Sequence, residues 1–221
     1  MNVLYVGSGN SASFIQKLSL EDYHVVAVNN AWRLFEDKKL DTWIHSGDFP
    51  FENRPTDKNF SQQISTKKYN QAACNITKKL KIACQSSPHY VGYTIFFLGL
   101  YWIMDSLCPA KISLLGFDHD YNPKKVKKWN DNGRPNPQNY YLKDKNKTIK
   151  EWSEDFFSGM NKDSFYGHGT PDPLRLGEDY LINKFQQALE NCKKLNIDLV
   201  NLSPVDSKIN IAPKESIFSN V

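Results

Sequence analysis

The sequence predicts one α/β domain with a mostly parallel sheet, helices on both faces and a lid-like insertion. Three observations lead to this fold class. Apolar, β-branched runs alternate with helix-like segments over residues 2–45, polar or glycine-rich turns follow the runs, and the composition changes after residue 121. Such alternation implies right-handed crossovers between parallel strands. The length of 221 residues and the 40% of hydrophobic residues fit a single domain over residues 1–221.

The first half of the expected sheet comes from three short apolar runs. The first two runs are each followed by turn residues and a helix-like segment, and the third leads into Ser46-Gly47-Asp48. In chain order we expect a strand over Asn2–Val6, a turn over Gly7–Ser11, a helix over Ala12–Leu18, a strand over His24–Val28, a helix over Ala31–Lys38 and a strand over Thr42–His45. This order is typical of a Rossmann-like fold.

The remaining elements are expected to complete the sheet. Residues 50–75 are polar and mixed, which is typical of a loop or a peripheral segment. Residues 93–107 are apolar on nearly all sides, so other elements should cover this helix. The further expected elements are a strand over Leu80–Cys84, a helix over Tyr93–Leu107, a strand over Lys111–Leu115, an amphipathic helix over Leu181–Leu195 and a strand over Ile197–Leu202.

A lid-like insertion is expected over residues 122–164. From Asn122 to Lys150 the chain is rich in Lys, Asn and Pro and shows little periodicity. A long segment without periodicity inside a compact domain is usually functional or disordered. We therefore expect a mobile loop or lid within the domain.

Composition limits the class of protein and its place in the cell. No apolar run reaches the length of a spanning helix, and the N-terminus has no basic region before its first strand. The four cysteines lie far apart, without a CxxC pair, so we expect free, buried thiols in a reducing compartment. We expect a cytoplasmic protein, and a location at the inner face of the membrane is left open. The net charge of +4 suits an anionic ligand and by itself does not argue for nucleic acid.

The turn Gly7-Ser8-Gly9-Asn10-Ser11 joins the first strand to a helix and is a candidate phosphate site. Glycine lets the backbone approach a ligand closely, and a helix start offers free N–H groups. The third glycine of the dinucleotide fingerprint is missing, and Asn29-Asn30 stands where an acidic residue would hold a ribose, which disfavours NAD. The alternative is a plain turn between a strand and a helix.

Other strand ends carry residues with several possible roles. The carboxyl ends of parallel strands face one crevice, where ligands bind. His45 suits a ligand contact or a satisfied core histidine. Asp118 and Asp120 have the spacing of a DxD that binds Mg²⁺ or Mn²⁺, or Asp118 orders its loop. His168, between two glycines, suits a general base or a surface position.

Taken together, these residues resemble the bacterial lipooligosaccharide sialyltransferases of glycosyltransferase family 42. Gly7–Ser11 is similar to the GNGPS-type turn of that family, with Ser8 in place of Asn. Asn30 matches an Asn after the second strand, and His45 stands in place of another Asn. Gly116-Phe117-Asp118 looks like the Gly-Ile-Asp of the family, Phe165-Tyr166-Gly167-His168 its Tyr-x-Gly-His, and Leu202-Ser203-Pro204 its last strand end.

The resemblance implies a metal-independent glycosyltransferase with a CMP-linked, sialic-acid-like donor and no cofactor. It implies that His168 is the base and that Tyr121 or Tyr140/Tyr141 contacts phosphate. The implied donor-binding residues are Gly7, Ser8, Gly9, Asn10, Ser11, Asn30, His45, Asp48, Gly92, Gly116, Asp118, Tyr121, Tyr166 and Ser203. The acceptor would be a glycan or another hydroxyl compound, and a peripheral membrane contact and a homo-oligomer are left open.

Three alternatives remain on the same fold. The turn also resembles that of pyrophosphokinase-like proteins, in which Asp118 and Asp120 would bind Mg²⁺ beside ATP or a diphosphate. A non-catalytic nucleotide-binding or carbohydrate-assembly module is the second alternative. The third is a transferase that modifies nucleic acid, docked by Lys124–Lys128, and the small charge excess disfavours it.

Overall fold

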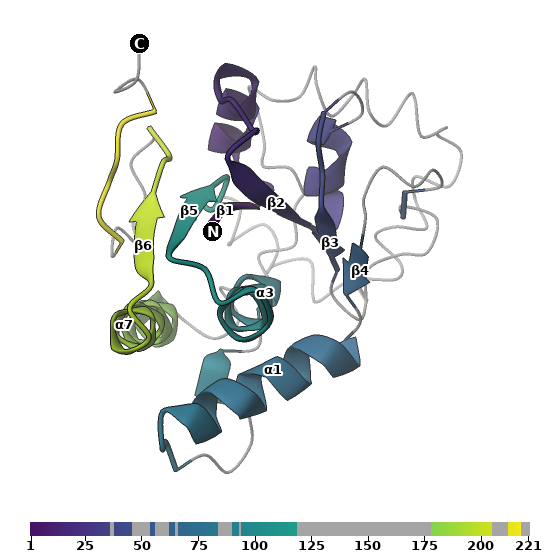
Figure 1. Ribbon diagram of the computed structural model, residues 1–221. Coiled ribbons are helices and arrows are strands. Elements are labelled where there is room, and N and C mark those ends of the chain that lie inside the picture. The colour runs from purple at the N-terminus through teal and green to yellow at the C-terminus, as the bar shows by residue number, and fades with distance from the viewer. Residues whose placement is uncertain are drawn as a thin grey trace, which may run out of the picture.

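A computed structural model describes residues 1–35, 38–45, 54–55, 62–64, 66–83, 90–92, 94–118, 178–204 and 212–217 (Figure 1). These residues form a six-stranded sheet with the strand order β4-β3-β2-β1-β5-β6. Every neighbouring pair is parallel. The strands are β1 (Asn2–Val6), β2 (Tyr23–Val28), β3 (Thr42–Ile44), β4 (Gln62–Ile64), β5 (Lys111–Leu115) and β6 (Asp198–Asn201).

The strand order places a topological switch point between β1 and β5. From β1 the chain builds outward through β2, β3 and β4, and it then returns to the other side of β1 to form β5 and β6. In open α/β sheets, ligands bind outside the carboxyl ends of the strands at such a point. The predicted Rossmann-like α/β fold is confirmed. The place where such folds bind ligands lies beyond Val6 and Leu115, the last residues of β1 and β5.

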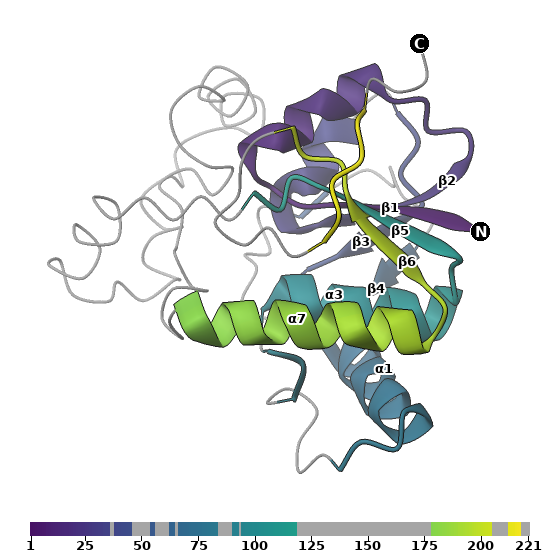
Figure 2. The same ribbon diagram turned by 90° about the vertical axis from the view of Figure 1, so that its left-hand side faces the viewer.

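Both faces of the sheet are covered by helices (Figures 1 and 2). Alternate side chains of β1 enter opposite core layers, with Val3 and Tyr5 in one and Leu4 and Val6 in the other. The first layer is covered by α1 (Thr66–Lys79), α3 (Ile95–Trp102) and α7 (Glu178–Lys194). The second is covered by the short 3-10 helices η1 (Asn10–Lys17) and η2 (Asn29–Phe35). A sheet buried on both faces explains why β1 and β2, near its centre, are mainly apolar.

Helix α3 is buried between the sheet and α1 (Figure 1). A π-helical turn, η4 (Ile103–Leu107), continues it, and every side chain from Phe96 to Met104 is buried. At Gly99 an added Cβ would lie 2.1 Å from the Tyr5 hydroxyl oxygen. That hydroxyl lies within hydrogen-bond distance of the carbonyls of Ile95 (3.1 Å) and Phe96 (3.0 Å). The prediction of a helix covered on all sides is confirmed.

Helix α1 and strand β4 occupy a region for which the sequence predicted only a loop or a peripheral segment. The predicted strand over Leu80–Cys84 is also wrong for residues 80–83, which form the turn that follows α1. Lys81 adopts a left-handed φ of 55°, the Ile82 amide donates to Thr77 (2.9 Å), and the Lys81 amide donates to Lys78 (3.0 Å). This is a Schellman helix end, in which apolar residues after the helix cover its last turn. Cys84 lies outside the described residues.

Helix α7 and β6 complete the far side of the sheet. Asn191 of α7 is buried, and its amide donates to the hydroxyls of Tyr90 (2.9 Å) and Tyr101 (2.8 Å), which ties α7 to α3. Burial raises the pKa of Tyr101, so this hydroxyl stays protonated at neutral pH. Residues 212–217 lie along β6, where the Asn201 amide donates to Pro213 (2.8 Å).

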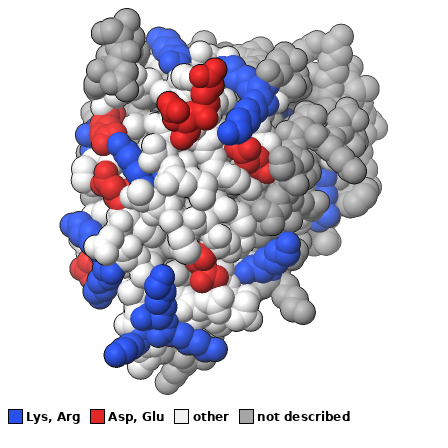
Figure 3. Space-filling model, viewed as in Figure 1, with Lys and Arg blue, Asp and Glu red and all other residues white. Residues whose placement is uncertain are grey.

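Charged side chains of both signs are interspersed on the face shown in Figure 3. Lysines gather on the lower part of this face, over the end of α1, where Lys78, Lys79 and Lys81 are exposed. None of the helices among the described residues has the length and apolar character needed to cross a bilayer.

Candidate functional site

The loop after β1 packs directly on the end of β5. The Gly7 amide donates to Leu115 (2.8 Å) and the Gly9 amide donates to Gly116 (2.6 Å). A Cβ on Gly7 would lie 2.5 Å from the Gly116 carbonyl oxygen, and Gly116 itself has a φ of +75°. These glycines therefore allow two strand ends to meet at the switch point.

Asp118 joins three strand ends at this point. It is 5% exposed, and its Oδ2 accepts from the Ser11 amide at 2.7 Å. Its Oδ1 accepts from the hydroxyl of Ser203 at 2.8 Å and from the hydroxyl of Ser11. The Ser11 hydroxyl in turn accepts from the Gly116 amide at 3.0 Å. We call the hydrogen-bonded residues Ser11, Gly116, Asp118 and Ser203 the Asp118 network.

Two amides that the sequence assigned to a ligand phosphate are thus engaged within the chain. The Gly9 amide binds Gly116, and the Ser11 amide, in the first turn of η1, binds Asp118. Ser8, directly before Gly9, is 5% exposed. The structure brings together the predicted residues of the β1 loop and of the ends of β5 and β6, and several of their polar groups bind one another. These residues are Gly7, Ser8, Gly9, Ser11, Gly116, Asp118 and Ser203. Asn10 is the first residue of η1.

The end of β2 lies on the other side of β1 and carries two buried asparagines. Asn29 has a left-handed φ of 46°, and its carbonyl accepts from Trp43 Nε1 at 2.8 Å. Asn30 is 3% exposed, and its Oδ1 has no hydrogen-bond partner among the residues that the structure describes. A buried amide oxygen without a partner carries a desolvation penalty, so it is a natural acceptor for a ligand donor.

His45 and Gly92 complete the predicted residues within the described part of the chain. His45 follows β3, is 6% exposed, and its ring lies 4.7 Å from that of Trp43. Gly92 precedes α3, has a φ of +112°, and a Cβ there would lie 2.7 Å from the Phe97 ring. Both are buried against aromatic side chains.

Several predicted residues lie outside the described residues. These are Asp48, Asp120, Tyr121, Tyr140, Tyr141, Tyr166, the predicted base His168 and the whole of the predicted lid at 122–164. Within the described ranges, no group of three or more His, Cys, Asp or Glu side chains could hold a metal ion. Of the two aspartates in the alternative metal site, the structure describes Asp118. Its two carboxylate oxygens accept three hydrogen bonds from the chain.

Sequence reasoning missed Asn201 and Phe117. The Asn201 Oδ1 accepts from the Ser203 amide at 2.9 Å and so positions the residue that binds Asp118. Phe117 packs on Tyr5 and Phe96, with ring centroids 4.7 Å from each. A polar residue at the end of the apolar run of β6 was the available signal for Asn201. Phe117 gave no signal, because one aromatic residue in a turn has many uses.

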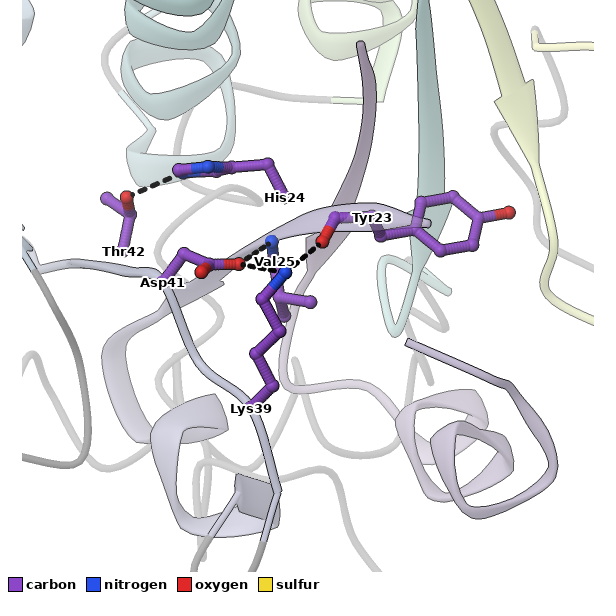
Figure 4. Close-up of polar contacts among 6 residues, drawn as sticks. All are labelled: Tyr23, His24, Val25, Lys39, Asp41 and Thr42. Carbon is purple, nitrogen blue, oxygen red and sulfur yellow. Dashed lines mark hydrogen bonds and ion pairs between the residues drawn. The ribbon is translucent and has the colours of Figure 1, made fainter. Parts of the chain in front are cut away.

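A second polar cluster lies at the amino edge of the sheet, away from the candidate site (Figure 4). His24 Nε2 lies 3.0 Å from Thr42 Oγ1, and Asp41 Oδ2 accepts from the Val25 amide at 2.7 Å. Lys39 lies 3.4 Å from the same carboxylate and donates to the Tyr23 carbonyl at 2.8 Å. These contacts join the starts of β2 and β3, which is a structural role.

Comparison of this chain with protein-family models, with curated proteins and with solved structures found no match.

Proposed function

We propose that this protein is a metal-independent glycosyltransferase that binds a nucleotide sugar across the carboxyl edge of the sheet. The observation that carries the proposal is the group of polar strand ends on both sides of β1. It includes the buried Asn30 Oδ1, which has no partner within the described ranges. The resemblance of the same strand ends to those of the family 42 sialyltransferases favours a CMP-linked donor. The acceptor is a glycan or another hydroxyl compound.

Each strand end has a role in this proposal. Asn30 accepts a hydrogen bond from the nucleoside or the sugar, and the loop of Gly7–Ser11 forms the floor of the crevice. Tyr121 or Tyr140/Tyr141 contacts the phosphate. His168 removes the proton from the acceptor hydroxyl as that oxygen attacks the anomeric carbon, the bond from this carbon to the phosphate oxygen breaks, and the nucleotide leaves with its electron pair. An imidazole suits this step because its ordinary pKa is close to the working pH.

The first test is a thermal-shift screen of CMP, UDP, GDP, ADP, dTMP and ATP, each with Mg²⁺ and with EDTA. A ligand that binds only the folded protein must raise the melting temperature. We expect CMP to raise it equally in both conditions, and Asn30→Ala to abolish the rise. Lys78→Ala, on the exposed side of α1, is the matched control and should keep the wild-type response.

The screen also separates the rival enzyme class. A response to ATP or a diphosphate only in the presence of Mg²⁺ would refute the metal-independent reaction and favour a pyrophosphokinase-like enzyme. An unchanged CMP response in Asn30→Ala would remove Asn30 from the site.

The role of His168 has its own test. With a nucleotide sugar identified by the screen, His168→Ala should lower kcat by about 10²–10⁴-fold, which is the usual contribution of a general base. The affinity for the nucleotide should stay unchanged, because the base acts on the acceptor. Turnover at the wild-type rate in His168→Ala would show that another group is the base.

A further inference from the structure

The Asp118 carboxylate occupies the position that a ligand phosphate takes in many α/β proteins. In dinucleotide-binding folds, the glycines after the first strand let the backbone approach a pyrophosphate at the start of the following helix. Here a Cβ on Gly9 would lie 2.6 Å from Asp118 Oδ2, so the carboxylate lies directly on the glycine loop. The same oxygen accepts from the amide of Ser11 in the first turn of η1.

The groups around this carboxylate are matched to an anion. One backbone N–H and two hydroxyls, from Ser11 and Ser203, donate to it. A negative charge is favourable at a helix start, and the chain itself supplies that charge from β5. A phosphate brought to the same loop would meet a buried carboxylate and would find these donors already taken.

The end of the neighbouring strand, β2, supports the same conclusion. Asn30 follows β2, on the opposite side of β1 from Asp118, and offers a buried carbonyl oxygen without a partner in the part of the chain that the structure describes. An oxygen of this kind satisfies itself with a ligand hydroxyl or amino group, not with a phosphate oxygen. The strand ends on both sides of β1 therefore carry acceptors.

We propose that Asp118 determines specificity as a built-in anion, which rejects phosphate at the β1–η1 loop and directs the hydroxyl- or amino-bearing part of the ligand there. The ligand phosphate binds elsewhere along the carboxyl edge. This inference rests on the proposed function only in assuming that the ligand is a nucleotide sugar. The rejection of phosphate is a property of the protein alone, so it can fail or hold independently of sugar transfer.

The experiment measures anion binding to Asp118→Ala and Asp118→Asn. The first variant leaves the donors of Ser11 and Ser203 facing a space the size of a small carboxylate. The second keeps the shape and removes the charge. We expect formate and inorganic phosphate to stabilise Asp118→Ala in a saturable manner at constant ionic strength. The phosphate affinity of each variant should exceed that of the wild type by about tenfold or more.

Asp41→Ala is the matched control, because Asp41 also accepts from a backbone amide but lies at the amino edge of the sheet and not at a helix start. It should gain no response to either anion. Equal phosphate affinity in the wild type and both Asp118 variants would overturn the proposal. If the variants do not fold, an NMR titration of the wild-type protein with phosphate tests the proposal. The amide resonance of Ser11 should not shift, and a saturable shift would overturn the proposal.

Discussion

At the scale of single residues, His24 couples the stability of the sheet to pH. Burial is the main cause that lowers its pKa below the ordinary 6.5, while Asp41 raises it and Lys39 lowers it. The folded protein therefore favours the neutral imidazole more than the unfolded chain does. The resulting stability is fully present above the unfolded pKa of 6.5 and is lost as the pH falls through the folded value.

We expect the melting temperature to fall between pH values of about 7.5 and 5.5, which span the ordinary titration of histidine. In His24→Gln the fall should be smaller, because glutamine keeps a polar group beside Thr42 and does not titrate. Thermal unfolding of the two proteins at matched ionic strength measures the difference. An identical pH dependence would assign the titration to another group.

Contrasting thiols show how much a residue depends on its surroundings. Cys192 in α7 is buried, and burial raises its pKa to about 12. Cys108 is exposed and adopts a left-handed φ of 44° directly before Pro109. The sequence predicted free, buried thiols. Cys74, Cys108 and Cys192 are free among the described residues, but the prediction of burial is wrong for Cys108, which is exposed. It could not separate an inert buried thiol from an accessible one, because this depends on packing from distant segments.

At the scale of elements, the contact of α3 with β1 depends on Gly99. Alanine normally favours a helix over glycine by about 1 kcal/mol. At Gly99, however, the new methyl group would lie 2.1 Å from the Tyr5 hydroxyl and would force α3 away from the sheet. We therefore expect Gly99→Ala to destabilise the protein by about 1–3 kcal/mol, the usual range for overpacking.

The double variant identifies the cause. Tyr5→Phe removes the hydroxyl, and the nearest ring carbon to the new methyl is then 2.9 Å away. Gly99→Ala should destabilise the Tyr5→Phe protein less than it destabilises the wild type, as chemical denaturation of the four proteins measures. Additive effects would mean that α3 does not press on Tyr5.

The elements that the sequence predicted are those whose apolar pattern is local. The runs of β1, β2, β3, β5 and β6 and the apolar helix α3 are continuous in the sequence, and all are found. Strand β4 is Gln-Gln-Ile, which carries no apolar run, and it is a strand because β3 offers it a partner. Helix α1 is rich in Lys, Asn and Thr, but it carries Tyr69, Ala72, Ala73 and Ile76 at helical spacing, and all four are buried. The sequence analysis missed this local pattern.

The sequence predicted where in the fold the candidate site lies, but not which of its residues bind one another. Parallel strands bring their polar ends to one edge, so Ser11, Asn30, Asp118 and Ser203 were expected there. Their partners were not predictable, because the bond from Ser203 to Asp118 depends on the register of β6 against β5. The helix start that the sequence assigned to a phosphate instead holds an acidic side chain of the chain itself.

At the scale of the whole molecule, the sheet edge beside β6 is closed by the chain itself. The Lys111 ammonium contacts both carboxylate oxygens of Glu215 at 2.7 and 2.6 Å. This contact raises the pKa of Lys111, chiefly through its hydrogen bond to Glu215. The backbone of residues 213–215 hydrogen bonds on both sides of Asn201. The outer strand is thereby paired along part of its length, which limits edge-to-edge association.

The Asp118 network also has a consequence for the order of folding. It joins Asp118 to Ser11 across 107 positions and to Ser203 across 85 positions. Closing such long loops is entropically unfavourable until β1, β5 and β6 have docked. We therefore expect these bonds to form after the transition state, so that weakening them accelerates unfolding more than it slows folding, as stopped-flow kinetics of Ser203→Ala would measure. The lifetime of the native chain, and not its speed of assembly, is then set in part at the candidate site.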